Sequence, residues 1–169
     1  MAKSLLRTNN EVAEIYRRHA NTVFGVCFTY MKNNADTDDA VSETFLKLIK
    51  SALPFQSEEH EKAWLIRTAT NVCKDILKHW WRGNENIDDY SEKLHAEDSE
   101  DSIEIDAVME AICGLPDKYK TVIYLYYFEG YNGAEISKIV GKPQPTVHYH
   151  LQEARKILKV RLGDDFDEK

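Results

Sequence analysis

An acidic segment near the middle of the chain limits what this sequence can fold into. Residues 85–106 carry ten acidic side chains against one lysine, Lys93. Between residues 85 and 100 there is too little apolar area to offset the entropy of ordering the chain, and the like charges repel one another. We therefore expect an acidic flexible linker over residues 85–102, joining folded units at 1–84 and 103–169.

The N-terminal unit shows the apolar spacing of helices and no alternating pattern of strands. Apolar residues within 23–31 recur on one side of a first helix. Asp36 is expected to cap a second helix, and a loop over residues 51–60 separates it from a third. Gly83 is expected to end that long third helix, so this unit is a bundle of three or four helices.

The C-terminal unit is expected to hold four short helices. Gly114 and Gly130 end the first two, and Pro145 suits the first turn of the fourth because no intrahelical N–H is needed there. The predicted fold class is all-α, with two small helical bundles joined by the acidic linker.

A helix-turn-helix pattern lies within the C-terminal unit. Ser137 supplies a small residue where two helices cross, Gly141 a turn residue that tolerates a positive φ, and Val147 a β-branched core residue. Leu151 and Ala154 continue the core face, so the second helix could enter a DNA major groove. Helix pairs ended by glycine also occur in helical proteins that bind no DNA, but the full spacing favours DNA binding.

The overall charge does not exclude nucleic acid as a partner. The chain of 169 residues carries a net charge of −7, but residues 85–106 alone contribute −9 and leave the remainder at +2. Cys27, Cys73 and Cys113 form no CxxC pair, which favours a reducing, cytoplasmic location. We find no segment long and apolar enough for membrane insertion.

Metal, cofactor and catalytic signatures are weak. His148 and His150 diverge by about 200° on a helix, so they cannot share an ion. The sequence contains neither HExxH nor GxxxxGK[ST]. We expect no metal site, no cofactor and no enzyme activity.

Two sets of motifs, in order, resemble the extracytoplasmic-function (ECF) family of bacterial sigma factors. Residues 36–46 resemble the segment that docks on the clamp helices of core RNA polymerase, and residues 64–75 the helix that recognises and opens the −10 promoter element. Leu115-Pro116, residues 126–130 and residues 135–155 resemble the domain that binds the −35 element.

The resemblance implies a sigma factor that directs promoter-specific transcription initiation, with core polymerase, promoter DNA and an anti-sigma factor as partners. It implies polymerase-binding residues on the second helix: Asp36, Asp39, Glu43, Phe45 and Leu46. Cationic, polar and stacking side chains on the third helix suit the −10 element: Arg67, Asn71, Lys74, Lys78, Trp81 and Arg82. The last predicted helix offers residues for the −35 element: Thr146, His148, Tyr149, His150, Gln152, Glu153, Arg155 and Lys156.

The sequence also departs from the family pattern. Ser42 replaces a usual Gln, Thr70 stands where a basic residue is common, and residues 148–150 are His-Tyr-His where the family favours Lys-Ser-Arg. Neutral histidines add little phosphate affinity, so we expect a weak −35 contact that acid strengthens. The alternatives are a stand-alone helix-turn-helix regulator and a sigma-like module that only binds another protein.

Overall fold

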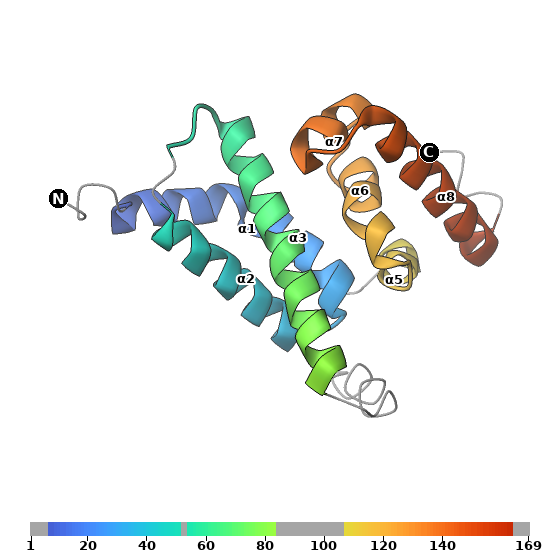
Figure 1. Cartoon of the computed structure of the whole chain (residues 1–169), viewed down its shortest axis with the longest axis horizontal. Helices are drawn as coiled ribbons and strands as arrows, with labels where there is room; N and C mark the ends of the chain where they lie inside the picture. Colours follow the sequence, from blue (N-terminus) through green and yellow to red (C-terminus); the bar gives the residue numbers. More distant parts are fainter. Residues whose placement is uncertain (1–6, 52–53, 84–106, 164–169) are drawn as a thin grey trace.

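The computed structural model describes residues 7–51, 54–83 and 107–163, and every regular element within these ranges is a helix. Figure 1 shows α1–α3 as one group and α5–α8 as a second group beside it. The all-α prediction is confirmed. The predicted linker, residues 85–102, lies outside the described residues, and its flexibility stays a prediction.

The N-terminal group consists of α1 (Asn9–Met31), α2 (Asn34–Lys50) and α3 (Glu58–Gly83). The prediction that Asp36 caps α2 is wrong. Asn33 is the N-cap: its side-chain oxygen accepts from the Asp36 amide at 2.8 Å, and its Nδ2 donates to the Asp36 carboxylate at 2.7 Å. Asn33 lies directly before the first residue of α2, which is the N-cap position, whereas Asp36 is the third residue of the helix.

The start of α3 also differs from the prediction. A loop was expected as far as His60, but α3 begins at Glu58. The Ser57 hydroxyl oxygen accepts from the His60 amide at 3.1 Å, and the first turn contains Glu58, Glu59 and Glu61. A side-chain cap and acidic residues near the positive end of the helix both favour this earlier start.

The C-terminal group consists of α5 (Ala107–Cys113), α6 (Asp117–Tyr127), α7 (Gly133–Val140) and α8 (Gln144–Leu162). The four predicted helices are confirmed, with Pro145 in the first turn of α8. Asn132 and Glu135 form a capping box at the start of α7, in which each side chain accepts from the other residue's amide.

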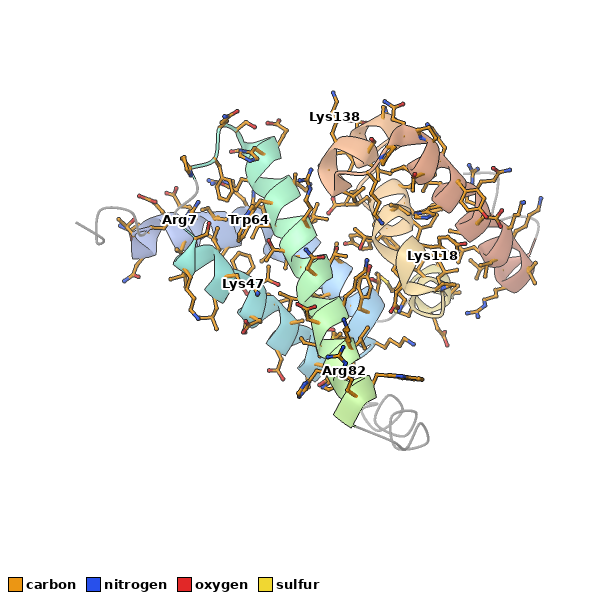
Figure 2. All side chains as sticks on the ribbon, in the orientation of Figure 1. Arg7, Lys47, Trp64, Arg82, Lys118 and Lys138 are labelled. Carbon is orange, nitrogen blue, oxygen red and sulfur yellow. The ribbon has the colours of Figure 1, made fainter. Side chains whose placement is uncertain are left out.

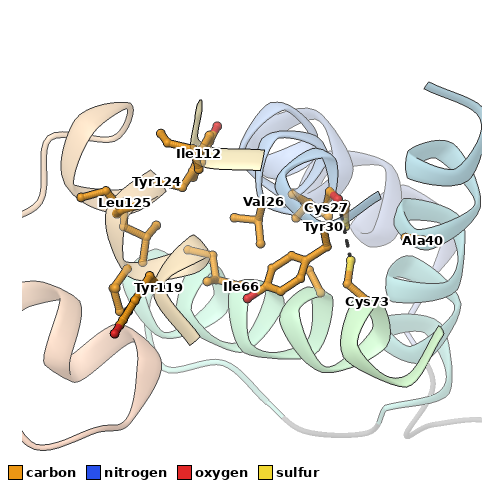
Figure 3. Packing of buried hydrophobic residues seen from close by; sticks show 14 of the residues in the cluster. Val26, Cys27, Tyr30, Ala40, Ile66, Cys73, Ile112, Tyr119, Tyr124 and Leu125 are labelled. Atoms are coloured by element: carbon orange, nitrogen blue, oxygen red, sulfur yellow. Dashed lines mark hydrogen bonds between the residues drawn. The ribbon is translucent and has the colours of Figure 1, made fainter. Parts of the chain in front are cut away.

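One hydrophobic core connects the two groups. Helix α1 packs against α5 and α6, and α3 packs against α7. Figure 3 shows Val26 and Tyr30 of α1 and Ile66 of α3 facing Tyr119 and Leu125 of α6. All five side chains are buried. The two groups therefore share apolar area that each would otherwise expose to water.

Candidate functional site

An acidic and apolar edge runs along α2. Asp39, Glu43 and Leu46 are exposed there, with Leu46 46% exposed. Asp36 is half-buried. Phe45 lies inward, 6% exposed, with its ring 4.9 Å from that of Tyr16 in an edge-on arrangement. We call Asp39, Glu43 and Leu46 the docking face.

A groove separates the docking face from α3. Its volume is about 470 Å³, and Asp39 and Glu43 of α2 face Asp75 and Trp80 of α3 across it. Trp80 packs against the core, whereas Trp81 is 68% exposed. Trp80 is therefore the structural one of these two tryptophans. Sequence reasoning did not assign Asp75 or Trp80 to this groove.

The outer surface of α3 carries the residues expected to contact the −10 element. Asn71, Lys78, Trp81 and Arg82 are exposed, and Arg82 lies at the end of α3 that is farthest from α7 (Figure 2). Cationic heads and an exposed indole ring are the groups that bind and stack on single-stranded nucleic acid. Lys74 is half-buried and lines a cleft against the C-terminal group.

Arg67 contacts the C-terminal group directly. Its Nε donates to the Ile139 carbonyl oxygen at 2.6 Å, and its Nη2 donates to the Lys138 carbonyl oxygen at 2.7 Å. These carbonyls lie in the last turn of α7, where helices have unsatisfied acceptors and partial negative charge. Gly141 lies beneath the guanidinium: a Cβ added there would be 3.1 Å from the Arg67 Cζ.

Further hydrogen bonds join α1 and α3 to α6. The Thr121 hydroxyl lies 2.9 Å from both the Tyr30 and the Thr70 hydroxyl oxygens. Burial raises the pKa of Tyr30, so this phenol stays protonated. Glu129 accepts a hydrogen bond from Thr22 and lies 3.7 Å from the Lys62 Nζ. Thr70, the position where the family favours a basic residue, serves here as a contact between the two groups.

Helices α7 and α8 form the predicted helix-turn-helix. Gly141 has φ 72°, and the Ser137 hydroxyl donates to the Lys142 carbonyl at 2.5 Å within the turn. The inner face of α8 is buried as expected: Val147, Leu151, Ala154 and Leu158. The sequence pattern and the structure therefore agree on which side of α8 faces outward.

The outer face of α8 presents most of the residues expected to contact the −35 element. His148, Tyr149, Gln152 and Lys156 are exposed, and Thr146, Glu153 and Arg155 are half-buried. The Lys156 Nζ lies 3.4 Å from the Glu153 carboxylate. Arg155 stacks near the Tyr126 ring, 5.6 Å from its centroid, beside a hollow of about 670 Å³ that is also lined by His148, Gln152 and Lys159.

His150 does not lie with the other residues of this set. Its ring is half-buried, edge-on to Tyr119 at 5.4 Å, and its Nδ1 is buried without a hydrogen-bond partner among the described residues. Burial lowers the pKa of His150, and the positive charges of Lys142, Lys118 and Lys74 lower it further. This histidine therefore gains a proton only at a lower pH than an ordinary imidazole.

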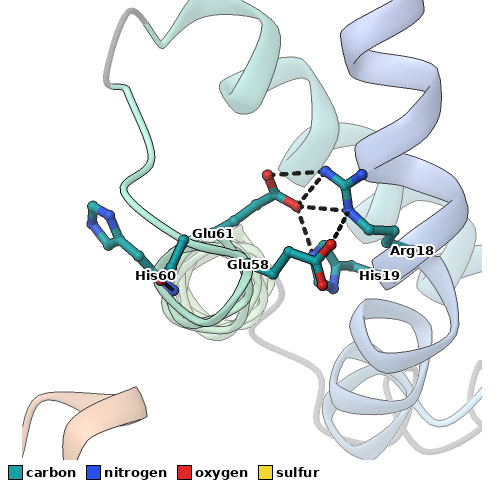
Figure 4. A network of polar contacts seen from close by, with 6 residues as sticks. Arg18, His19, Glu58, His60 and Glu61 are labelled. Atoms are coloured by element: carbon teal, nitrogen blue, oxygen red, sulfur yellow. Dashed lines mark hydrogen bonds and ion pairs between the residues drawn. The ribbon is translucent and has the colours of Figure 1, made fainter.

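Other titratable clusters have a structural role. Glu61 is buried between α1 and α3, where it accepts from Arg18 at 2.9 Å and lies 2.8 Å from the His19 Nε2 (Figure 4). The three cysteines are free and buried, and burial raises the pKa of Cys113 to about 11. Within the described ranges, no three His, Cys, Asp or Glu side chains are grouped to hold a metal ion, and no helix is long and apolar enough to cross a membrane.

Two family models match the chain in succession. Residues 15–83 match sigma-70 region 2, and residues 105–158 match sigma-70 region 4. The first match contains the docking face and the outer surface of α3. The second contains the helix-turn-helix.

Curated relatives match across both units. The chain is 30% identical to the ECF RNA polymerase sigma-E factor of Haemophilus influenzae over 159 residues, covering 86% of this chain and 84% of the relative. It is 28% identical to the RNA polymerase sigma factor SigV of Bacillus subtilis over 144 residues, covering 85% and 86%. It is 26% identical to the ECF RNA polymerase sigma factor SigW of the same organism, covering 91% and 88%. The chain therefore belongs to the ECF sigma factors, and it directs promoter-specific transcription initiation by RNA polymerase.

Proposed function

We propose that residues 1–84 bind core RNA polymerase and the −10 element, that residues 103–169 bind the −35 element, and that residues 85–102 tether the two. The observation that carries this division is the order of the matches: region 2 ends at residue 83 and region 4 begins at residue 105. As in sigma factors generally, we assign no catalytic step to this chain.

The docking face is the proposed contact with the polymerase clamp helices. Asp39 and Glu43 give it negative charge, and Leu46 adds an exposed apolar side chain. Complementary charge steers association, and a central apolar anchor slows dissociation. Ile49, 41% exposed one turn further along α2, extends the same apolar surface. Phe45 supports this face from below, since it is buried.

The outer surface of α3 is the proposed −10 contact. Lys78 and Arg82 supply charge for the DNA backbone, and Trp81 supplies a stacking surface worth roughly 1–3 kcal/mol for each base that it captures. Asn71 adds a donor and acceptor for a base edge. Arg67 and Lys74 join this surface only after the two groups separate, because both lie against the C-terminal group.

The outer face of α8 is the proposed −35 contact. Gln152 can pair with adenine and Glu153 can accept from cytosine N4, whereas Arg155 and Lys156 attract phosphates. With His150 turned toward Tyr119, the fixed cations carry most of the electrostatic attraction near neutral pH.

The proposal also includes the compartment in which the protein works and a second protein partner. Free, buried thiols suit a reducing compartment, so we place the protein in the cytoplasm, with an anti-sigma factor as a further partner. Such a partner would compete with polymerase for the same surfaces.

The decisive experiment is run-off transcription with core polymerase. Asp39→Lys/Glu43→Lys should reduce core binding and transcript by about tenfold or more, since reversed charges repel a basic partner. Glu14→Lys/Glu110→Lys is the matched control, because it reverses two exposed acids on α1 and α5. Equal core binding by a folded docking-face variant and the wild type would show that this docking face is wrong.

A further inference from the structure

A small cleft lies where α3 meets the C-terminal group. Its volume is about 150 Å³, and its walls come from α1, α3, α6, and the end of α7 with the turn that follows. It is lined by four basic residues, two from each group of helices: Arg67 and Lys74 on one side, Lys118 and Lys142 on the other. Basic side chains from both groups are thus concentrated in one place.

The positive charge of this cleft is not balanced within the described residues. Neither Lys74 nor Lys142 forms an ion pair there, and the described contact of Lys118 is with the Tyr119 ring at 5.1 Å. Asp117 lies on the wall, but its carboxylate pairs with the buried Lys120 at 3.3 Å. We call the structure, in which the two groups of helices pack against each other, the closed arrangement. Like charges brought together in this way disfavour it unless an anion offsets them.

Two titratable groups respond to this charge. Burial, followed by the charge of Lys74, lowers the pKa of Lys142. His150, whose Nδ1 has no partner among the described residues, has its pKa lowered by burial and then by Lys142, Lys118 and Lys74. The cations of the two groups are therefore close enough to repel one another across the cleft.

We propose that this cleft binds a single phosphate group, held between Lys74 of α3 and Lys118 and Lys142 of the C-terminal group. The ligand class is a phosphate-type oxyanion, either inorganic phosphate or the terminal phosphate of a small ester. Lysine ammonium groups donate short, charge-assisted hydrogen bonds to such oxygens. The cleft, with a volume of about 150 Å³, is large enough for one tetrahedral anion.

The ligand would bridge the two groups and stabilise the closed arrangement. This consequence rests on the proposed function, because Arg67 and Lys74 are assigned to the −10 contact. A ligand that binds the closed form and not the open form shifts the equilibrium toward closure in proportion to its concentration over Kd. Phosphate in the cleft and promoter DNA on α3 would therefore exclude one another.

The test is isothermal titration of the full chain with inorganic phosphate at pH 7.5, with ionic strength held constant by NaCl. We expect saturable binding with one site per chain. Lys118→Ala/Lys142→Ala should weaken it by about tenfold for each lysine removed. The matched control is Lys50→Ala/Lys138→Ala, which removes two exposed lysines outside the cleft; Lys138 points outward from α7 in Figure 2. This control should bind within twofold of the wild type.

Titration with ADP distinguishes inorganic phosphate from the terminal phosphate of an ester. If ADP competes with inorganic phosphate, both bind the cleft through a phosphate group. The ligand with the lower Kd then identifies the source. Lys74→Ala, on the opposite wall, gives an independent variant if the double variant does not fold. Absence of saturable binding, or equal losses in the cleft and control variants, would overturn the site. Run-off transcription shows which of the two proposals fails. Normal initiation without phosphate binding would refute the phosphate site alone. Phosphate binding without initiation would refute the proposed function alone.

Discussion

Substituting Gly25 with alanine should separate the two groups of helices without disturbing either one alone. Gly25 lies in the middle of α1, against the ring of Tyr124 on α6. An added Cβ would overlap the Tyr124 hydroxyl and Cζ and lie 2.8 Å from Cε2. Tyr124 is only 7% exposed, so its ring has little room to turn away while α1 and α6 stay packed against each other.

The size of the effect follows from two contributions. Overpacking a well-filled contact costs about 1–3 kcal/mol, and that cost is paid only when α1 and α6 are in contact. Alanine also favours a helix over glycine by about 1 kcal/mol, but this gain is equal in the closed and open forms and cancels. The ratio of closed to open molecules should therefore fall by about 5- to 150-fold.

Small-angle X-ray scattering of the full chain measures this change. A compact chain of 169 residues has a radius of gyration of about 15 Å, and Gly25→Ala should increase it by several ångströms. Gly83→Ala is the control, since an added Cβ there meets nothing within 4 Å. An unchanged radius in Gly25→Ala, or an equal increase in the control, would refute this reasoning about the interface.

Other substitutions test separate parts of the structure. Arg67→Lys keeps the charge but loses the paired donors to the α7 carbonyls, so it should lower the closed fraction by up to about tenfold in the same scattering assay; no change would argue against the Arg67 contact. Leu158→Ala should destabilise the chain by about 2–5 kcal/mol in urea unfolding, because Leu158 is fully buried, and a loss below 1 kcal/mol would contradict the packing of α8. Because the folded protein lowers the pKa of His150, the unfolded chain binds that proton more readily, so stability should fall as pH drops below about 6.5. His150→Gln should reduce that dependence in thermal melts from pH 7.5 to 5.5, and an identical pH profile would exclude this histidine as the source.

Local sequence signals predicted the helices and the core face of α8 because their physical causes are local. Gly141 marks a left-handed turn that glycine adopts at little cost, and Val147 and Leu151 follow it at helical spacing. The predicted cap of α2, Asp36, is wrong because asparagine and aspartate both cap helices, and the true cap, Asn33, lies only three residues earlier. The position of the helix start decides between them.

Contacts between the two groups could not be predicted in this way. Arg67 lies at the spacing of an outward-facing residue, and its acceptors are main-chain oxygens about 70 positions later in the chain. Any residue type supplies a carbonyl oxygen, so no sequence pattern marks the partner. His150 likewise falls between the inner and outer faces of α8, and its orientation depends on Tyr119 of another helix.

Arg67 can contact α7 in the closed arrangement and DNA in the promoter complex because the polar contacts between the two groups of helices are electrostatically weak. The end of α7 offers Arg67 roughly half an elementary charge, whereas a DNA phosphate offers a full one. Lys62 and Glu129 lie 3.7 Å apart and keep partial contact with solvent, so their separation leaves no buried charge unpaired. We therefore expect Arg67 to transfer from α7 to the DNA backbone once polymerase holds the two groups apart, with the lost apolar contacts between α1 and α6 as the main cost of opening.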